Sequence, residues 1–475
     1  MVEQLKPDLC IIGAGAGGLA AATSAVQLGA EVILIERGEM GGDSLNAGCV
    51  PTKALLSAAK RAQAIREAGK FGIKAAAPQI DYAAVCAHIK DTVTALTPNN
   101  TQERFEGIGV RVIRAEGKFK DRTTVVAGNY EISARRFIVA TGSSPAIPPI
   151  SGLDRIPYLT NETIFDHPEL PENLIIIGAN PFGLELAQAF RRLGSDVTVL
   201  EALTPLENDD EEVRRPVLQR LNDEGVRIID KSRLERVEPL SSGMRVVFEK
   251  DGQSYSLDGT HLLIVAGRRP NIDGLNLEAA GIKYTPDGIA VNAGLKTSNR
   301  HVYAIGDVTG GLQYTHVATS HAAAVIKNAM FRLRERIDLD TLPWVTFTDP
   351  ELAHVGLTEE GARKKYGDKI NVLRWPYLEN DRAKIERRTE GYLKVITNRS
   401  GKILGASMVG EQAGELIQMW SLAMQKGINV KMMATYIAPY PTLAEINKRA
   451  AIAFFVPKLT NPFLKRVIAW LKKLG

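Results

Sequence analysis

Two stretches of the chain repeat one another at an offset of 165 residues, and this repeat constrains the fold more than any other feature. The first, DLCIIGAGAGGLAAATSAVQLGAEVILIE, ends at Glu36, and the second, NLIIIGANPFGLELAQAFRRLGSDVTVLE, ends at Glu201. Each reads as an apolar strand, a glycine turn, an amphipathic helix and a second apolar strand that closes on a carboxylate. This order is typical of the dinucleotide-binding βαβ unit, so the sequence predicts two such units.

The three glycines of the first stretch have separate roles. Gly13 permits the tight turn, Gly15 lets the backbone approach a pyrophosphate, and Gly18 allows the helix to pack closely on the strand. The helix N-terminus offers backbone N–H groups to the anion. Glu36, about twenty residues further on, can accept hydrogen bonds from the ribose hydroxyls. We therefore expect a bound dinucleotide here.

The second stretch is less regular. Gly178 and Gly183 match the outer glycines, but Asn180 occupies the middle position. Asparagine tolerates left-handed dihedral angles, so the turn can form; its side chain nevertheless occupies space where a pyrophosphate normally approaches. We expect dinucleotide binding here, and the alternative is that Asn180 weakens it. Glu201 favours NADH over NADPH, because a carboxylate repels a 2′-phosphate.

A single thiol lies in the segment GGDSLNAGCVPTK, which leads into an alanine- and leucine-rich helix. Cys49 falls in the first turn of that helix, where free N–H groups and the helix dipole favour a thiolate. Cys49 is therefore a candidate nucleophile or electron relay. Cys10, in an apolar strand, and Cys86, in a helical stretch, are expected to be buried packing residues. Three scattered cysteines do not form a disulfide framework, which agrees with a reducing compartment.

Composition excludes several other classes. A length of 475 residues suggests about three domains. The net charge of +5 is uneven: residues 446–475 carry seven Lys or Arg and no Asp or Glu, and the remainder carries 52 basic and 54 acidic residues. A nearly neutral body argues against nucleic-acid binding. No apolar run reaches the roughly 18 residues of a membrane span, so we expect a cytoplasmic protein.

The segment GGDSLNAGCVPTK resembles the redox-active motif of the pyridine nucleotide–disulfide oxidoreductases, flavoenzymes that include lipoamide dehydrogenase, glutathione reductase and mercuric reductase. The resemblance continues through RRFIVATGSSP, HVYAIGDV and PYPTLAEINKRAA, over roughly residues 8–455. It implies an α/β fold with two Rossmann-like domains and a C-terminal α+β dimerisation domain. The expected boundaries are 1–148 with 272–341 for the FAD domain, 149–271 for the NAD(P) domain, 342–457 for the dimerisation domain and 458–475 for a basic amphipathic tail.

The same resemblance implies FAD and NADH as cofactors, with NADPH less favoured, and no metal ligands. A helix that begins near Thr315 would point its N-terminus at the flavin. Lys53 and Glu185 are implied to form an ion pair beside the flavin and nicotinamide. The residues implied to contact FAD are Gly13, Gly15, Gly18, Glu36, Lys53, Gly117, Thr141, Gly142 and Asp307. Those implied to contact the nicotinamide nucleotide are Gly178, Gly183, Glu201 and Gly267.

In the family, two cysteines at the positions of residues 44 and 49 form a disulfide beside the flavin. Position 44 is Ser44, and a hydroxyl cannot form a disulfide. Ser44 has three interpretations: an engineered replacement of cysteine, a natural change in a single-thiol enzyme that reduces quinones, metal ions or oxygen species, or the mark of a redox-silent flavin-binding scaffold or sensor. The resemblance implies hydride transfer from NADH to FAD and on to a dithiol or disulfide acceptor, small or protein-bound, as in dihydrolipoyl dehydrogenase.

The family's His-Pro-Thr motif, which supplies a base, reads Tyr440-Pro441-Thr442 here, with Glu445 at the matching acid position. A tyrosine with a pKa near 10 is a poor base at neutral pH but can donate a hydrogen bond or a proton. The alternative is that Tyr440 is interface packing. We expect a cis peptide before Pro441. In the family this domain forms a homodimer, and its final motif enters the partner's active site.

The tail places apolar residues at helical spacing between cations. Two interpretations remain open for it: a helix docked on the dimer body, or one that contacts a membrane surface. The apolar positions are Phe463, Leu464, Val467, Ile468, Leu471 and Leu474, and the cations are Lys465, Arg466, Lys472 and Lys473.

Overall fold

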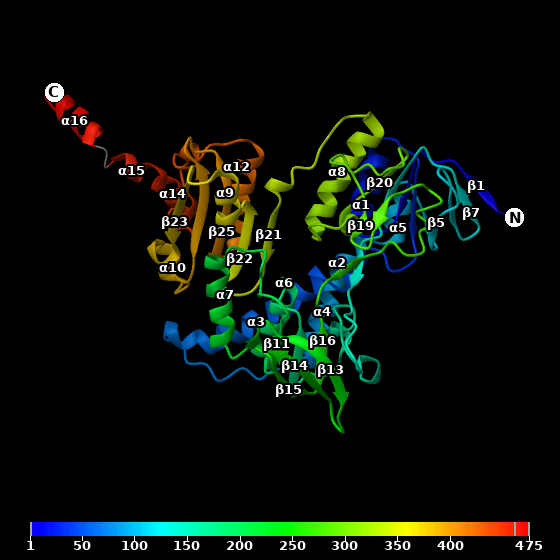
Figure 1. Ribbon diagram of the computed structural model, residues 1–475, viewed down its shortest axis with the longest axis horizontal. Coiled ribbons are helices and arrows are strands. Elements are labelled where there is room, and N and C mark those ends of the chain that lie inside the picture. Colours follow the sequence, from blue (N-terminus) through cyan, green and yellow to red (C-terminus); the bar gives the residue numbers. More distant parts are fainter. Residues whose placement is uncertain (1, 460–461, 474–475) are drawn as a thin grey trace. The chain divides into compact units, whose positions relative to one another are not determined.

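The computed structural model describes residues 2–459 and 462–473, and its chain forms two compact units (Figure 1). The first unit comprises Met1–Ala202 and Lys231–Ile337, and the second comprises Leu203–Asp230 and Asp338–Gly475. The four domain boundaries expected from the sequence stay predictions. The repeated βαβ elements both lie in the first unit.

A five-stranded parallel sheet carries the first βαβ element, in the strand order β20-β8-β2-β3-β4. Leu9 and Ile11 of the central strand belong to a core that includes helices α1 and α8, which lie side by side in Figure 1. Cys10 and Ile12 belong to the core on the opposite face. Because both faces of this sheet are covered, its strands are continuous apolar runs. The elements are β2 (Leu9–Ile12), α1 (Ala16–Gln27), β3 (Val32–Glu36), β4 (Val110–Arg114), β8 (Arg136–Val139), β20 (Val302–Ala304) and α8 (Thr315–Phe331).

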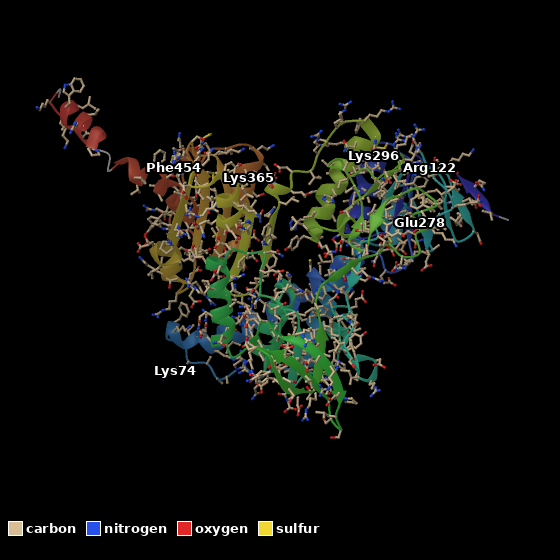
Figure 2. The ribbon with its side chains drawn as sticks, viewed as in Figure 1. Lys74, Arg122, Glu278, Lys296, Lys365 and Phe454 are labelled. Carbon is tan, nitrogen blue, oxygen red and sulfur yellow. The ribbon has the colours of Figure 1, made fainter. Side chains whose placement is uncertain are left out.

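A smaller sheet, in the order β1-β7-β6-β5, contributes Phe119 and Ile132 to that opposite core. The loops around it are fixed by polar contacts: Asn299 donates a hydrogen bond to the carbonyl of Arg122, 2.8 Å away. The ammonium of Lys296 lies 5.5 Å from the ring centroid of Tyr303; Figure 2 labels both Arg122 and Lys296. The strands of this sheet are β1 (Glu3–Leu5), β5 (Gly117–Phe119), β6 (Val125–Ala127) and β7 (Tyr130–Ile132), and a separate two-stranded sheet pairs β18 (Tyr284–Thr285) with β19 (Gly288–Ile289).

The second βαβ element has parallel strands in the order β11-β10-β16. An antiparallel sheet, β13-β14-β15, lies between β11 and β16 along the chain. The elements are β9 (Ser143–Pro145), η3 (Leu153–Arg155), η4 (Ile164–Asp166), β10 (Asn173–Ile177), α6 (Pro181–Leu193), β11 (Asp196–Leu200), β13 (Arg233–Pro239), β14 (Met244–Lys250), β15 (Gln253–Gly259), β16 (His261–Ile264) and β17 (Arg268–Pro270).

A proline interrupts the helices between β3 and β4. Helix α4 ends before Pro98, which lies in a short 3-10 turn, and Thr101 caps α5 by accepting from Arg104 N at 3.2 Å. A proline lacks the N–H of the helical ladder, which explains the interruption. The elements are α2 (Gly42–Asn46), α3 (Cys49–Glu67), η1 (Ala68–Phe71), α4 (Tyr82–Leu96), η2 (Thr97–Asn99) and α5 (Gln102–Gly107).

The second unit contains an antiparallel sheet of order β21-β22-β25-β24-β23, with Trp420 and Tyr377 buried in its core. The elements of the second unit are α7 (Glu211–Asp223), β12 (Arg227–Ile229), η6 (Leu339–Thr341), β21 (Pro343–Thr346), β22 (Glu351–Gly356), α9 (Glu359–Tyr366), β23 (Ile370–Pro376), η7 (Tyr377–Glu379), α10 (Asp381–Ile385), β24 (Tyr392–Asn398), β25 (Ile403–Gly410), α11 (Ala413–Leu416), α12 (Gln418–Gln425), α13 (Val430–Met433), α14 (Glu445–Ile452), η8 (Ala453–Phe455), α15 (Val456–Leu459) and α16 (Pro462–Leu471).

A buried lysine ties α7 to this sheet. The Lys394 ammonium, on β24, lies 2.8 Å from Asp210, 2.8 Å from Glu212 and 2.7 Å from Glu359, and its side chain is 3% exposed. A buried cation is tolerated only where opposite charges surround it. Hydrogen bonds from Arg374 and Lys394 lower the pKa of Glu212 to about 2. Glu212 therefore stays ionised beside the lysine.

The basic tail forms α16, in which Ile468, Trp470 and Leu471 are exposed. The side chains of Phe463, Leu464 and Lys465, and residue Leu474, lie outside what the structure describes. Within the described part of the chain, no helix has the length and apolar character needed to cross a membrane. The two interpretations of the tail stay predictions.

Candidate active site

The thiol lies where the sequence predicted, at the start of a helix. Helix α3 begins at Cys49, directly after its N-cap residue Gly48, and Cys49 is exposed. Ser44 lies on the short preceding helix α2. The hydroxyl of Thr315, at the first residue of α8, is 2.9 Å from Ser44 Oγ and 3.5 Å from Cys49 Sγ. One threonine hydroxyl thus bridges the two motif positions, a contact that sequence reasoning missed because more than 260 residues separate it from either partner.

The other two cysteines lie elsewhere. Cys10 is buried in β2, and burial raises the pKa of its thiol far above the ordinary value. Cys86 is only half-buried, which corrects the expectation of a fully buried residue. Cys86 lies on α4, and its sulfur is 3.7 Å from the carbonyl oxygen of His167. All three cysteines of the chain are free.

The predicted ion pair is present. Lys53 Nζ lies 2.7 Å from Glu185 Oε2; the glutamate side chain is 2% exposed and the lysine side chain 35%. Lys53 is on α3, one helical turn past Cys49, and Glu185 is on α6. The pair therefore connects the thiol-bearing helix to the helix of the second βαβ element.

Four residues expected to contact FAD line one pocket of the first unit: Gly13, Glu36, Gly117 and Thr141. Glu36 Oε2 accepts from Ala14 N at 2.6 Å, which holds the carboxylate at the rim of the glycine turn. The remaining lining residues are Ile12, Ile35, Arg37, Ala115, Glu116, Asn271, Asp273, Gly274 and Leu275.

The backbone around this pocket suits a close-lying dinucleotide. Gly13 has φ +107°, and a Cβ there would collide with the carbonyl oxygen of Ala140. A Cβ on Gly18 would collide with the Gly13 carbonyl oxygen, so helix and turn are in direct contact. Helix α1 begins after Gly15 without a side-chain cap. Uncapped N–H groups at a glycine-rich helix start are the donor set that a pyrophosphate requires, so the residues present fit FAD.

Thr141 and Gly142 are clamped by a residue that sequence reasoning missed. Thr141 Oγ1 donates to the Asn271 carbonyl at 2.7 Å, and Asn271 N donates to the Gly142 carbonyl at 2.9 Å. Gly267, just upstream, has φ +139° and accepts a hydrogen bond from Ala146 N.

Asp307 lies in a small polar cluster. Ser143 Oγ donates to Asp307 Oδ2 at 2.6 Å, and Arg268 lies 3.8 Å from Asp307 and 3.2 Å from Asp43. Burial raises the pKa of Asp307 above its ordinary value, and the hydrogen bond from Ser143 and the charge of Arg268 oppose that shift. Asn161 donates to the other oxygen of Asp43 at 2.9 Å. Asp43 itself belongs to the thiol motif, so the cluster joins that motif to Asp307.

The second glycine turn differs at its middle position. Asn180 has φ −74°, so it does not need the left-handed conformation that we considered; the left-handed residue is Gly178, at φ +114°. Asn180 caps α6 by accepting from Gly183 N at 3.0 Å, and its amide nitrogen donates to the Val265 carbonyl. Glu201 accepts from Ala179 N at 2.7 Å. The side chain of Asn180 therefore accepts a hydrogen bond from an N–H group that would otherwise be available to a pyrophosphate.

Tyr440 and Glu445 lie in the second unit and do not bond to each other. The Tyr440 hydroxyl donates to Asp381 at 3.2 Å, and this hydrogen bond raises the pKa of the phenol above 10. Glu445 instead pairs with Arg449 on the next turn of α14, at 2.7 Å. The peptide before Pro441 is cis, as predicted. Tyr440 is 71% exposed and stays protonated at neutral pH, so it can act as a donor but not as a base.

Comparison with known proteins agrees with this geometry. The family model described as pyridine nucleotide-disulphide oxidoreductase matches residues 7–322, and the dimerisation domain of the same family matches residues 342–451. The chain belongs to the pyridine nucleotide-disulphide oxidoreductase family. It is an FAD-dependent oxidoreductase that uses a pyridine nucleotide, and its dimerisation domain supports a homodimer.

Members of this family with different names are similar to the chain. Mercuric reductase of Lysinibacillus sphaericus is 37% identical over 96% of this chain and 84% of that protein. Dihydrolipoyl dehydrogenase of Bacillus subtilis (strain 168) is 33% identical over 94% and 98%. The solved structure of a Cu(II) complex of the HOCl-induced flavoprotein disulfide reductase RclA from Escherichia coli has a TM-score of 0.84, with 28% identity over 94% of this chain and 99% of that chain.

Proposed function

We propose that this enzyme transfers electrons from NADH through FAD to an acceptor, with Cys49 as the only thiol at the redox motif and without an internal disulfide. The observation that carries the proposal is the contact of Ser44 Oγ with Thr315 Oγ1, beside Cys49 Sγ. A hydroxyl at position 44 cannot take the part of a second thiol. When bound, FAD supplies the hydride-accepting and electron-donating chemistry.

The side chains around Cys49 support a single-thiol role. If Ser44 donates its proton to Thr315, then Thr315 donates its own proton toward Cys49 Sγ, so the two hydroxyls orient the sulfur. Lys53 neutralises the buried carboxylate of Glu185, and we assign the pair the role of holding α3 and α6 in register for hydride transfer. Glu201 supports NADH over NADPH, because a 2′-phosphate beside a carboxylate is repelled.

For the acceptor we propose the quinone, metal-ion or oxygen-species class. The metal-ion option has outside support, since relatives at 35–37% identity are named mercuric reductases and the RclA structure is titled a Cu(II) complex. The second candidate is a dithiol or disulfide acceptor, which the dihydrolipoyl dehydrogenases at 33% identity support. Against it stand Ser44 and the protonated Tyr440. The scattered cysteines support a reducing, cytoplasmic compartment.

Ser44→Cys separates the two acceptor classes. We expect the parent protein to reduce quinones or metal ions with NADH and to leave lipoamide unreduced, and we expect Ser44→Cys to gain lipoamide turnover and a long-wavelength absorption band on two-electron reduction. Stopped-flow absorbance and a steady-state acceptor panel measure both. Ser44→Ala is the matched control, since it removes the hydroxyl without adding a thiol. Lipoamide turnover by the parent equal to that of Ser44→Cys would contradict the proposal.

A further inference from the structure

Two histidines from separate segments of the first unit meet at a half-buried position that the redox machinery does not use. His167 follows the short helix η4, and His261 is the first residue of β16. Their Nε2 atoms are 3.1 Å apart, and their ring planes are nearly perpendicular. The backbone fixes this encounter, because Leu159, just before η4, pairs with β16 through hydrogen bonds to Leu262 and Ile264.

The remaining ring nitrogens already have acceptors. Nδ1 of His167 is 2.9 Å from the Glu169 carbonyl oxygen and 3.4 Å from Glu169 N; because the carbonyl oxygen can only accept and lies closer, we place the proton on this Nδ1. Nδ1 of His261 is 2.9 Å from Thr260 Oγ1, and that hydroxyl donates to the Asn173 carbonyl at 3.1 Å. Thr260 therefore accepts from His261. In this pair of tautomers both Nε2 atoms carry lone pairs that face one another, an arrangement that repels unless a cation lies between them.

The separation of the rings suits a metal ion. Zn²⁺–imidazole bonds are about 2.0–2.1 Å long, so two nitrogens 3.1 Å apart subtend about 98° at a shared ion. Two rings directed at that ion would have centroids about 4.8 Å apart, and the observed separation is 4.6 Å. A linear hydrogen bond between the two nitrogens would hold the centroids about 5.4 Å apart.

We propose that His167 and His261 form a two-histidine site for a divalent transition-metal ion of the zinc and copper class, separate from the flavin and nicotinamide residues. Imidazole nitrogens suit these ions, and each ring is oriented by a hydrogen bond from its other nitrogen, as metal-bound histidines are. Within the described residues, no group of three or more His, Cys, Asp and Glu side chains could hold a metal ion, so water completes the coordination. Glu169 adds a negative charge close to His261.

Titration of the untagged FAD-loaded protein with Zn²⁺ tests the site by calorimetry, and Cu²⁺ tests it by electron paramagnetic resonance. We expect one equivalent of Zn²⁺ per chain, and two imidazole nitrogens in the Cu²⁺ hyperfine pattern. His167→Gln and His261→Gln should each weaken binding at least tenfold, and the double variant should weaken it no more than the stronger of the two. His301→Gln, a change at a histidine that contacts Arg300, is the matched control and should bind as the parent does.

Two further measurements keep the proposal falsifiable. Cys49→Ser should retain the Zn²⁺ equivalent, because the thiol is not a ligand. NADH oxidation by His167→Gln should equal that of the parent, so that failure of the metal site and failure of the proposed redox function are read separately. If Zn²⁺ did not bind, or bound the double variant as tightly as the parent, the proposal would be overturned. The cation between the two rings would then be a shared proton.

Discussion

The two βαβ elements use the same backbone contacts but begin their helices differently. Ala14 N donates to Glu36 at 2.6 Å in the first, and Ala179 N donates to Glu201 at 2.7 Å in the second. In both, a Cβ on the third glycine would collide with the carbonyl oxygen of the first. The difference is that α1 has no side-chain cap, whereas Asn180 caps α6.

The two helix starts suit ligands of different residence: a permanently bound one at α1 and an exchanging one at α6. At an uncapped helix start, the N–H groups have no side-chain acceptor to give up. Their hydrogen bonds to a bound anion therefore contribute fully to the binding free energy. At α6, a pyrophosphate must first displace the Asn180 amide from Gly183 N, which lowers its net gain. We interpret the first turn as suited to a resident FAD, and the second as suited to a nicotinamide nucleotide that leaves after each turnover.

The largest expected effects come from breaking both glycine contacts in parallel. Gly18→Ala and Gly183→Ala each force a Cβ against a backbone carbonyl oxygen, and we expect each to lower the free energy of unfolding by about 1–3 kcal/mol. Thermal unfolding measures this. Gly18→Ala should also lose FAD during purification, whereas Gly183→Ala should keep FAD and lose NADH binding. Gly107→Ala, where a Cβ meets nothing within 4 Å, is the control; equal FAD loss in both variants would contradict the division of roles.

The ion pair between the two helices gives the next effect. Lys53→Met leaves the buried Glu185 carboxylate without its lysine, and we expect a loss of about 1–3 kcal/mol of stability, less than for a fully buried pair because Lys53 is partly exposed. We also expect a fall in the rate of flavin reduction by NADH, measured by stopped flow. The double variant Lys53→Met with Glu185→Gln should regain stability but not rate. Recovery of both would mean that the pair only supports the fold.

The smallest expected effect tests the cap itself. Asn180→Gly makes the second turn like the first and should tighten NADH binding about two- to fivefold, since helix N-terminal charge effects are about 0.3–1 kcal/mol. Its cost in stability should be a few tenths of a kcal/mol. Gly15→Asn is the reciprocal change, and it should weaken FAD retention. Fluorescence titration with NADH tests Asn180→Gly, and measurement of FAD release tests Gly15→Asn. If Asn180→Gly bound NADH with unchanged affinity, the Asn180 cap would not account for the difference between the two turns.

Local patterns let the sequence predict part of this site. The glycine turns, Glu36, Glu201 and the start of α3 at Cys49 follow from short-range patterns in which each residue type meets one backbone requirement. The ion pair of Lys53 with Glu185 was reached through the family resemblance, because the two residues lie far apart in the chain.

Contacts made by the tertiary fold could not be predicted in this way. Nothing near Thr315 in the sequence indicates that its hydroxyl meets Ser44 and Cys49, and Asp381 is not marked as the acceptor for Tyr440. The dihedral angle of Asn180 was also misjudged, because the strained position belongs to Gly178 and the asparagine needs only an extended backbone. Such features depend on which helix ends converge, which no local pattern encodes.

The second unit is built from two separate segments of the chain, which limits how it can be exchanged between related enzymes. A fragment that starts at Asp338 carries Lys394 and Glu359 but lacks Asp210 and Glu212, so it leaves a buried ammonium group with one of its three carboxylates. Recombination that swaps only the C-terminal part between related enzymes would create the same mismatch. The segment Leu203–Asp230 therefore has to be inherited together with the C-terminal sheet, although more than a hundred residues of another unit are encoded between them.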